Sequence, residues 1–400
     1  MSSFHAALEI GTTRTVLAIG EAEVGGRFKI TCHSEINSTG VRKSQILDIK
    51  QATTSIGAVL RDIEKKQAEA GNSVSLGNAF LVVSGQHVKA DRFQGIVPVE
   101  GEKVGPEEIE EVFSSSRTFR LPKDREFLDI VDQDYEVDGR GGIATPRGMS
   151  GRILKLNTLQ IHADRNRIND ARTAADGAKL EIRDPLFAAT CAAEAVLEEH
   201  ERKNGVLVLD VGGGSTGYAV YSDAHLVSTG VIGVGGDHVT NDIAHAFQTT
   251  NAQAEQIKLA EASALIGSMG GASPRVKVPG SSPLIESRTI SRRALDTVVN
   301  ARLRELFTVM RETLEDQDLA NRLHAGVVLT GGGAAMRDLD TLVSRELGMP
   351  VRIGRPIHVD GLEDEKHPES FAAISGALLY ASRNYEEKSI FGGLLRKFFT

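Results

Sequence analysis

The sequence predicts a soluble α/β protein of two to three domains, and three observations support this. The chain has 400 residues, of which 40% are apolar and 25% charged, the composition of globular domains with a sizeable core. Three strand-like apolar segments each run directly into a glycine-rich turn, at Gly11, Gly212 and Gly331. Residues 84–162 differ from their surroundings, because strand-like pieces alternate there with a single helical one. This change predicts a small inserted α+β module.

The first elements follow from local patterns. Residues 6–10 and 15–19 are apolar segments around a polar turn, which predicts a β-hairpin. Residues 49–70 have helical spacing of apolar positions and stop at Gly71, a residue type that commonly follows the end of a helix. A short apolar strand is expected at residues 79–83.

The rest of the chain alternates between strands and helices. In the inserted module we expect strands at 95–99, 127–137 and 151–161 and a helix at 105–120. Helices are expected after the module at 164–180 and at 185–200, the second of these rich in alanine. The later expected elements are helices at 237–247, 252–266, 290–315 and 370–383 and a buried strand at 327–329.

Charge and cysteine content exclude several classes of protein. The formal net charge of −8 argues against a nucleic-acid-binding protein, which requires a basic surface. Cys32 and Cys191 are the only cysteines and lack metal-ligand spacing, so we expect no disulfide framework and a cytoplasmic location. The N-terminal residues show no signal-peptide pattern, and no apolar run has the length of a membrane-spanning helix.

The second glycine turn contains a misleading motif. Gly212, Gly214 and Gly217 have the G-x-G-x-x-G spacing that binds a dinucleotide pyrophosphate. That function requires a helix directly after the glycines, because the phosphates lie at the helix N-terminus. Residues 218–221 are Tyr-Ala-Val-Tyr, aromatic and β-branched residues that favour a strand. The sequence therefore excludes a dinucleotide oxidoreductase.

Two of the glycine turns share one format. Glu9 and Asp210 each end a strand, and each is followed by glycine, small hydroxyl residues and a return strand. Glycine allows backbone N–H groups to approach phosphate oxygens, and hydroxyl groups add further donors. A carboxylate beside phosphates is repelled unless Mg²⁺ lies between them, so Asp210 is a candidate for the metal shell. Two such hairpins facing each other would hold a polyphosphate.

This arrangement resembles the superfamily of actin, Hsp70 and sugar-kinase ATPases. Its members carry two phosphate loops, two connecting helices and an adenosine motif. Here the phosphate loops match 9–14 and 210–216, and the connecting helices match 184–195 and 371–381. The adenosine motif matches 329–334. Glu255 and Lys258 match the helix that flanks the adenosine. The resemblance implies an actin-like two-lobed fold of duplicated RNase H-like cores, with ATP and Mg²⁺ in the cleft between the lobes.

Further motifs make the chain similar to the FtsA family of bacterial cell-division proteins. The similar stretches are LEIGTTRT, with Glu where the superfamily usually has Asp, LVVSGQHVKADRFQGIVPV, VTNDIAHAF followed by AEQIK, and VVLTGGGAAM. The module at 84–162 lies where that family carries its inserted subdomain. The implied organisation is a first lobe of 1–83 and 163–203 with 370–383 returning to it, a second-lobe core of 204–235 and 323–369, a small second-lobe subdomain of 236–322, and a linker and tail of 384–400.

The resemblance also implies site residues. The catalytic candidates are Asp210, Asp184 and Glu9, and Asp210 and, through water, Glu9 would hold Mg²⁺. The nucleotide-binding candidates are Gly11, Thr12, Thr13, Arg14, Gly212, Gly213, Gly214, Ser215, Glu255, Lys258, Gly331, Gly332 and Gly333.

Several of these residues have a second interpretation. The guanidinium fork of Arg14 suits a phosphate, but it also suits a surface ion pair. Asp184 precedes a proline at an expected helix start, so it either caps that helix or positions the attacking water. Glu255 and Lys258 lie three residues apart on a helix and either contact adenosine or form only an ion pair.

Residues 389–400, SIFGGLLRKFFT, predict an amphipathic helix that binds a membrane surface. Six apolar side chains cover about half of the helix circumference at 100° per residue: Ile390, Phe391, Leu394, Leu395, Phe398 and Phe399. Arg396 and Lys397 lie beyond the edges of this face and suit anionic lipids. Packing back onto the body is the alternative, which the polar linker and two glycines disfavour. One tail binds weakly, so attachment is expected to depend on assembly into a polymer with many tails.

The resemblance implies a division protein that polymerises and anchors FtsZ filaments to the cytoplasmic side of the membrane at the septum. It would also recruit later division proteins, and its ATPase activity would be slow at most. The FtsZ C-terminal peptide would dock on the small second-lobe subdomain, where Arg302 lies in a basic helix segment. The alternatives are a small-molecule kinase, an Hsp70-like chaperone and an MreB-like shape protein of the same superfamily.

Overall fold

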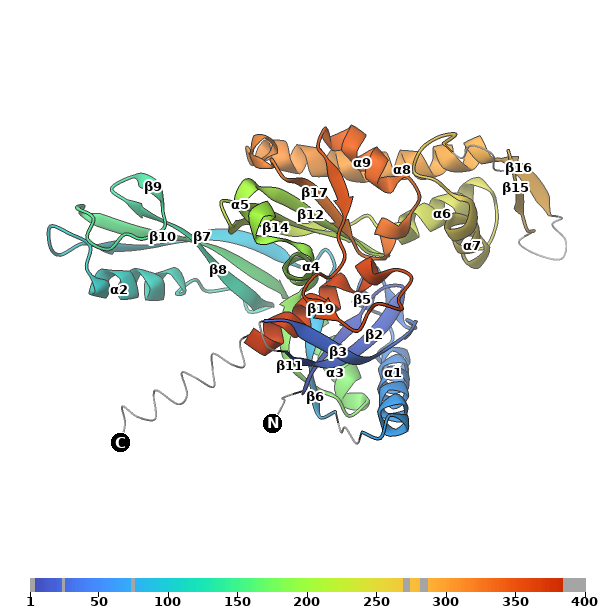
Figure 1. The fold of residues 1–400 in the computed structure, drawn as a ribbon, viewed down its shortest axis with the longest axis horizontal. Coiled ribbons are helices and arrows are strands. Elements are labelled where there is room, and N and C mark those ends of the chain that lie inside the picture. The colour runs from blue at the N-terminus through green and yellow to red at the C-terminus, as the bar shows by residue number, and fades with distance from the viewer. Residues whose placement is uncertain (1–3, 24–25, 73–75, 269–273, 281–286, 384–400) are drawn as a thin grey trace.

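The computed structural model describes residues 4–23, 26–72, 76–268, 274–280 and 287–383. These residues form two lobes, each built on its own sheet, and a third sheet that projects from them (Figure 1). Among the described residues, no helix is both long and apolar enough to cross a bilayer. The tail predicted to bind membranes, with residues 390–399, lies outside the described residues.

The first lobe contains a six-stranded sheet in the order β11-β6-β1-β2-β3-β19. Its strands are β1 (Phe4–Ile10), β2 (Arg14–Ala22), β3 (Phe28–Asn37), β6 (Asn78–Val83), β11 (Glu181–Phe187) and β19 (Val359–Asp360). The first three strands pair antiparallel, while β6 pairs parallel with both β1 and β11. The helices α1 (Ile49–Glu69) and α3 (Arg165–Gly177) pack on this sheet and on each other. The predicted hairpin and the predicted helix at 49–70 are confirmed.

The second lobe repeats this arrangement with five strands in the order β14-β13-β12-β17-β18. The strands are β12 (Val206–Val211), β13 (Thr216–Ser222), β14 (His225–Ile232), β17 (Gly326–Thr330) and β18 (Val351–Ile353). Again the first three pair antiparallel, and the last two join in parallel. Because β13 starts at Thr216, a strand and not a helix follows the glycines, as the sequence predicted.

A four-stranded sheet in the order β7-β10-β8-β9 projects to the left in Figure 1. Its elements are β7 (Lys89–Pro98), α2 (Pro106–Ser116), β8 (Arg125–Val137), β9 (Arg140–Ile143) and β10 (Ile153–Asp164). Strands β7 and β8 contact the edge strand β14 of the second lobe, where Gln133 Nε2 donates to the carbonyl of Leu226 at 3.0 Å. The strand expected at 95–99 begins earlier, at Lys89, because β7 pairs along its whole length with β10.

Two helices lie where the lobes join: α4 (Ala188–Val196) and residues 372–383, which are helical. The helix α5 (Glu199–Asn204) leads into the second lobe. The outer part of that lobe contains α6 (Gly236–Ala246), α7 (Asn251–Glu261), β15 (Arg275–Val278), β16 (Arg288–Ser291) and α8 (Arg292–Asp316). The remaining elements are β4 (Val41–Arg42), β5 (Gln45–Ile46), η1 (Ala320–Arg322), η2 (Gly332–Ala335), α9 (Leu339–Leu347) and η3 (Pro368–Phe371).

Three predicted helices were clearly longer than those observed, and the one expected at 105–120 ends at Ser116. The alanine-rich helix expected at 185–200 begins only at Ala188 and is interrupted at Leu197 before α5 starts. The residues before it form β11, which pairs parallel with β6, so tertiary pairing overrides the local preference. The helix expected at 252–266 ends at Glu261, because Ala262 is extended.

Candidate functional site

The two acidic hairpins have the same local structure. In the first, the N–H of Gly11 donates to the carbonyl of Arg14 at 3.0 Å, and in the second the N–H of Gly212 donates to the carbonyl of Ser215 at 3.0 Å. Each turn joins the antiparallel pair at the centre of its lobe's sheet, β1 with β2 and β12 with β13. The shared format in the sequence therefore corresponds to a shared backbone geometry.

The two turns, one from each lobe, lie directly against each other. A Cβ atom placed on Gly213 would lie 2.1 Å from Oγ1 of Thr13, and one placed on Gly214 would lie 2.4 Å from Oγ1 of Thr12. A Cβ atom at either position would displace the threonine hydroxyl or the turn, so the absence of a side chain permits this close contact. The structure therefore brings together backbone groups and hydroxyls from both lobes, the donors that suit a phosphate.

The strand-end carboxylates lie behind these turns and are partly buried. Burial, and then the neighbouring charge of Glu9, raise the pKa of Asp210 to about 7. Burial also raises the pKa of Glu9, against the lowering effect of Arg14. Glu9 and Asp210, each at the start of its own glycine turn, repel each other. A divalent cation bound by these carboxylates would relieve the repulsion. Among the described residues, no group of three His, Cys, Asp or Glu side chains forms a metal site by itself.

The third glycine turn lies directly against Asp210. Gly331 has a φ of +82°, and a Cβ on it would lie 2.4 Å from Oδ1 of Asp210. Gly332 and Gly333 follow in η2, and a Cβ on Gly333 would lie 2.4 Å from Cγ1 of Val211. The three predicted glycine turns are therefore neighbours in space.

Glu255 and Lys258 form an ion pair on α7, with Nζ and Oε2 2.7 Å apart. Lys258 also donates to the carbonyl of Gly236 at 3.2 Å and to Oγ1 of Thr240 at 2.9 Å. Gly236 itself donates its N–H to the carbonyl of Gly212, which joins α6 to the second turn. The pair thus lies beside the second turn, and adenosine contact by these two residues remains a prediction.

Arg14 forms an ion pair, as the second of the two interpretations of this residue predicted. Its Nη1 lies 2.5 Å from Oε2 of Glu35, and its guanidinium lies 4.8 Å from the ring centroid of Phe371. A further bond joins Nη2 to the carbonyl of Ser370. A phosphate contact by Arg14 would require the ion pair with Glu35 to open.

The structure corrects the expected helix start at Asp184. This residue lies inside β11 and is exposed, and the N-cap of α4 is Phe187. The prediction that Asp184 caps a helix is therefore wrong, because pairing of β11 with β6 extends the strand past Pro185. Its role with the attacking water remains a prediction.

Arg302 on α8 is already paired with a carboxylate of α6 and with one of its own helix. Its Nε and Nη2 donate to the two carboxylate oxygens of Asp242 at 2.6 Å and 3.0 Å, and Nη1 pairs with Glu305. An acidic peptide would have to compete with Asp242 for this guanidinium.

Two groups near the converging turns were missed from the sequence. Asp237 lies in the first turn of α6, and its Oδ1 would lie 3.3 Å from a Cβ on Gly213. The turn between β4 and β5 places Ser44 against Thr12, with the N–H of Ser44 donating to Oγ1 of Thr12 at 2.7 Å. The Gly-Gly-Asp sequence at the N-terminus of α6 was a usable signal for Asp237, whereas nothing local marks Ser44.

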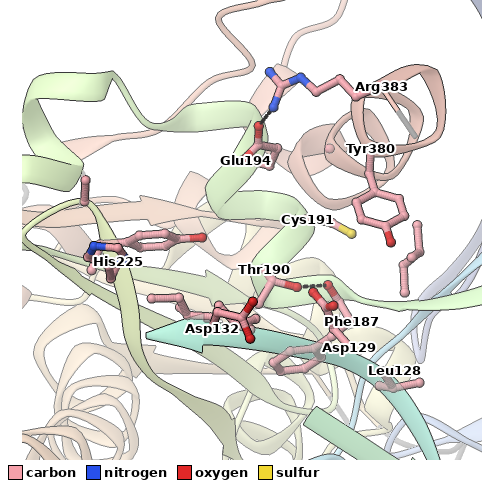
Figure 2. Close-up of a pocket in the computed structure, with 16 residues that line it drawn as sticks. Leu128, Asp129, Asp132, Phe187, Thr190, Cys191, Glu194, His225, Tyr380 and Arg383 are labelled. Carbon is pink, nitrogen blue, oxygen red and sulfur yellow. Dashed lines mark hydrogen bonds and ion pairs between the residues drawn. The ribbon is translucent and has the colours of Figure 1, made fainter. Parts of the chain in front are cut away.

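A separate cavity of about 310 Å³ lies where the inserted sheet, both lobes and helix 372–383 meet (Figure 2). Its polar lining is largely paired: Asp132 binds Arg117, and Glu194 binds Arg383, the last described residue. Burial raises the pKa of Asp129 and, to about 12, that of Tyr380. None of the residues of the three glycine turns lines this cavity.

Comparisons with known proteins identify similar families and relatives. The profile described as "Cell division protein FtsA" matches residues 207–376, and the profile "SHS2 domain inserted in FTSA" matches residues 85–162. The chain is 33% identical to the cell division protein FtsA of Pseudomonas aeruginosa, over 93% of this chain and 88% of that protein. It is 31% identical to FtsA of Escherichia coli strain K12, over 94% of this chain and 90% of that protein.

Solved structures show the same fold at lower identity. The PilM–PilN type IV pilus biogenesis complex matches with a TM-score of 0.65 at 17% identity, over 94% of this chain and 98% of that chain. MreB5 of Spiroplasma citri bound to ADP matches with a TM-score of 0.57 at 14% identity, over 97% and 98%. These likenesses concern the fold alone, and with the inserted-domain match they confirm the predicted actin-like architecture.

Proposed function

Because the chain belongs to the FtsA family of cell-division proteins, we propose that it is an ATP-binding, polymerising adaptor that attaches FtsZ filaments to the membrane. The observation that carries the nucleotide site is the convergence of Thr12 and Thr13 on Gly213 and Gly214. Loops from opposite lobes that meet through glycines and hydroxyls supply donors to phosphate oxygens from both sides. MreB5 of Spiroplasma citri, which shares the fold, has been solved bound to ADP and to AMPPNP.

Mg²⁺ belongs to the same proposal. Asp210, with Glu9 acting through water, would hold the cation, which would neutralise the phosphates and the two carboxylates together. Gly331, Gly332 and Gly333 would lie along the nucleoside, with Glu255 and Lys258 at its edge. Occupation of the cleft would tie the two lobes to a single ligand and fix their relative orientation, the state in which we propose that the protein assembles into filaments.

The tail supplies the membrane attachment. Residues 389–400 carry one apolar face flanked by Arg396 and Lys397, and we place this helix in the interface of an anionic bilayer on the cytoplasmic side. Because a single short helix binds weakly, assembly of many chains would make attachment firm. Nucleotide in the cleft would in this way control membrane binding from a distance.

The partner surfaces follow from the remaining elements. The FtsZ C-terminal peptide would dock beside α8 at Arg302, in exchange for the present contact with Asp242. The inserted sheet projects away from both lobes, which leaves it available for filament contacts or for later division proteins (Figure 1).

Sedimentation with anionic lipid vesicles tests this function. The full chain and a chain ending at Lys388 are compared with and without ATP and Mg²⁺. We expect the full chain to sediment with vesicles, more completely with ATP, and to bring FtsZ down with it. The shortened chain should stay in the supernatant with FtsZ. Equal sedimentation of both chains would refute the role of the tail, and no effect of ATP would refute the coupling to assembly.

A further inference from the structure

The two-residue turn between β4 and β5 has an unusual backbone. Lys43 and Ser44 have φ angles of +50° and +56°, although neither is glycine. Hairpin turns of this kind usually contain Asn-Gly, because a Cβ atom disfavours the left-handed region. Backbone strain of this sort persists where surrounding contacts impose it, and it concentrates at functional sites.

The turn contacts both glycine loops of the cleft. On the first-lobe side, the N–H of Ser44 donates to Oγ1 of Thr12 at 2.7 Å. On the second-lobe side, a Cβ on Gly214 would lie 2.9 Å from Cα of Lys43 and 3.2 Å from the nitrogen of Ser44. The hydroxyl of Ser44 also lies 3.5 Å from that of Ser215. A first-lobe turn therefore reaches directly onto the loop of the other lobe.

The turn is held in place from behind by the end of β6. The hydroxyl of Ser84 lies 3.4 Å from that of Ser44, and a Cβ on Gly85 would lie 2.8 Å from Cβ of Ser44. The strained turn is thus supported by the residues that follow β6 in the sheet of the first lobe.

Two of the cations near the glycine turns are already held in ion pairs. Glu9, Asp210 and Asp237 are acidic, while Arg14 is bound to Glu35 and Lys258 to Glu255. Lys43 is exposed, and within the described part of the chain it has no ion-pair partner. The positive charge of Lys43 also acts on His238 near the start of α6. Burial lowers the pKa of His238 most, and the charge of Lys43 lowers it further.

We propose that the Lys43–Ser44 turn is a third phosphate-binding element of the cleft, in which the Lys43 ammonium supplies positive charge to the nucleotide phosphates and the Ser44 hydroxyl donates to them. The inference rests on the proposed ATP site. The turn that carries Lys43 belongs to the first lobe and contacts the second. Binding of the phosphates by this lysine would therefore link phosphate recognition to closure of the cleft.

Lys43→Asn in the full-length protein tests the inference. Asparagine tolerates the left-handed region, so the turn is preserved while the charge is lost. We expect the affinity for fluorescent ATP to fall about tenfold, as for loss of one charge-assisted contact. The affinity for adenosine, measured by competition, should stay within about twofold, and the Tm without ligand should not fall. Lys43→Arg should retain most of the ATP affinity.

Lys50→Asn is the matched control, because Lys50 is an exposed lysine on the nearby helix α1. It should leave the ATP affinity unchanged. Equal ATP affinity for Lys43→Asn, Lys50→Asn and the unaltered protein would overturn the inference and leave the ATP site intact. An equal loss for ATP and adenosine would also overturn it, since the phosphates would then not be the group recognised. Absence of ATP binding by the unaltered protein would instead refute the proposed function itself.

Discussion

The hydroxyl of Thr13 lies against Gly213 on the opposite lobe, where a Cβ atom would come within 2.1 Å of Oγ1. This contact joins the two central hairpins of the duplicated sheets. It leaves no space for a Cβ atom, so an alanine at this position would displace the threonine hydroxyl or the turn.

Gly213→Ala should therefore hold the two turns apart. We expect the free energy of unfolding to fall by about 1–3 kcal/mol, the usual cost of adding an atom to a filled site. The affinity for ATP should also fall. Denaturant titration measures the change in stability, and a nucleotide-binding titration measures the change in affinity. The second variant, Thr13→Ala, removes Oγ1 and leaves Oδ1 of Asp237 as the nearest atom, 3.3 Å away, with Thr13 Cβ at 3.4 Å. The double variant should thus recover stability, and additive losses would contradict the direct contact.

Asp210 should make stability depend on pH. Its pKa is raised to about 7 in the folded protein, against an ordinary value of 3.8. Between these two pH values the folded chain keeps the proton on Asp210, whereas the unfolded chain has lost it. The contribution of this group to stability therefore falls as pH rises from about 4 to about 7. Asp210→Asn removes the titration, and it should be more stable than the unaltered protein at pH 8 by about 1–2 kcal/mol and equally stable near pH 4.

The same variant separates stability from ligand binding. Mg²⁺ with ATP should raise the Tm of the unaltered protein at pH 8 and raise that of Asp210→Asn much less, because the amide carries no charge for the cation. A stability difference that does not change between pH 4 and pH 8 would contradict the assignment of the raised pKa to Asp210.

Arg302 should bind an acidic peptide more tightly once Asp242 no longer holds it. Asp242→Asn weakens the two-bond pairing at 2.6 Å and 3.0 Å, and we expect about a threefold gain in affinity for the FtsZ C-terminal peptide by fluorescence anisotropy. Arg302→Ala should lose about tenfold. Arg293→Ala, an exposed arginine on the same helix, controls for net charge and should have little effect. If neither Asp242→Asn nor Arg302→Ala changes the affinity, the peptide docks elsewhere.

Local signals predicted the parts of the fold that local physics determines. The hairpin around Gly11 was predicted because apolar alternation and turn residues lie close in sequence. The strand after Gly217 was predicted for the same reason, and it excluded the dinucleotide fold. The resemblance carried the prediction further, to the family and the two-lobed architecture, because ordered motifs spread along the chain constrain a fold more than any one of them.

The parts that were missed depend on contacts between distant residues. Pairing of β11 with β6 converts the segment around Pro185 into a strand, which its sequence alone does not indicate. The partners of Arg14 and Arg302 come from other elements, so their ion pairs could not be deduced from spacing. The turn at Lys43 opposes local preference, since lysine and serine disfavour a positive φ. Contacts with distant residues, with Thr12 and Gly214 and with Ser84 and Gly85, account for it.

The helices between the lobes cross at a point that tolerates no side chain. A Cβ on Gly376 would lie 1.7 Å from the carbonyl oxygen of Cys191 in α4. Gly376→Ala should therefore destabilise the fold by about 3 kcal/mol or more, because the neighbour is backbone and cannot rotate away. Gly57→Ala on α1 is the control: there a Cβ would meet only the end of the Arg61 side chain, at 3.2 Å. The better helix propensity of alanine should stabilise that variant by about 0.5–1 kcal/mol. Denaturant titration of both variants checks the opposite signs, and a stabilising effect of Gly376→Ala would show that the helices do not cross in contact.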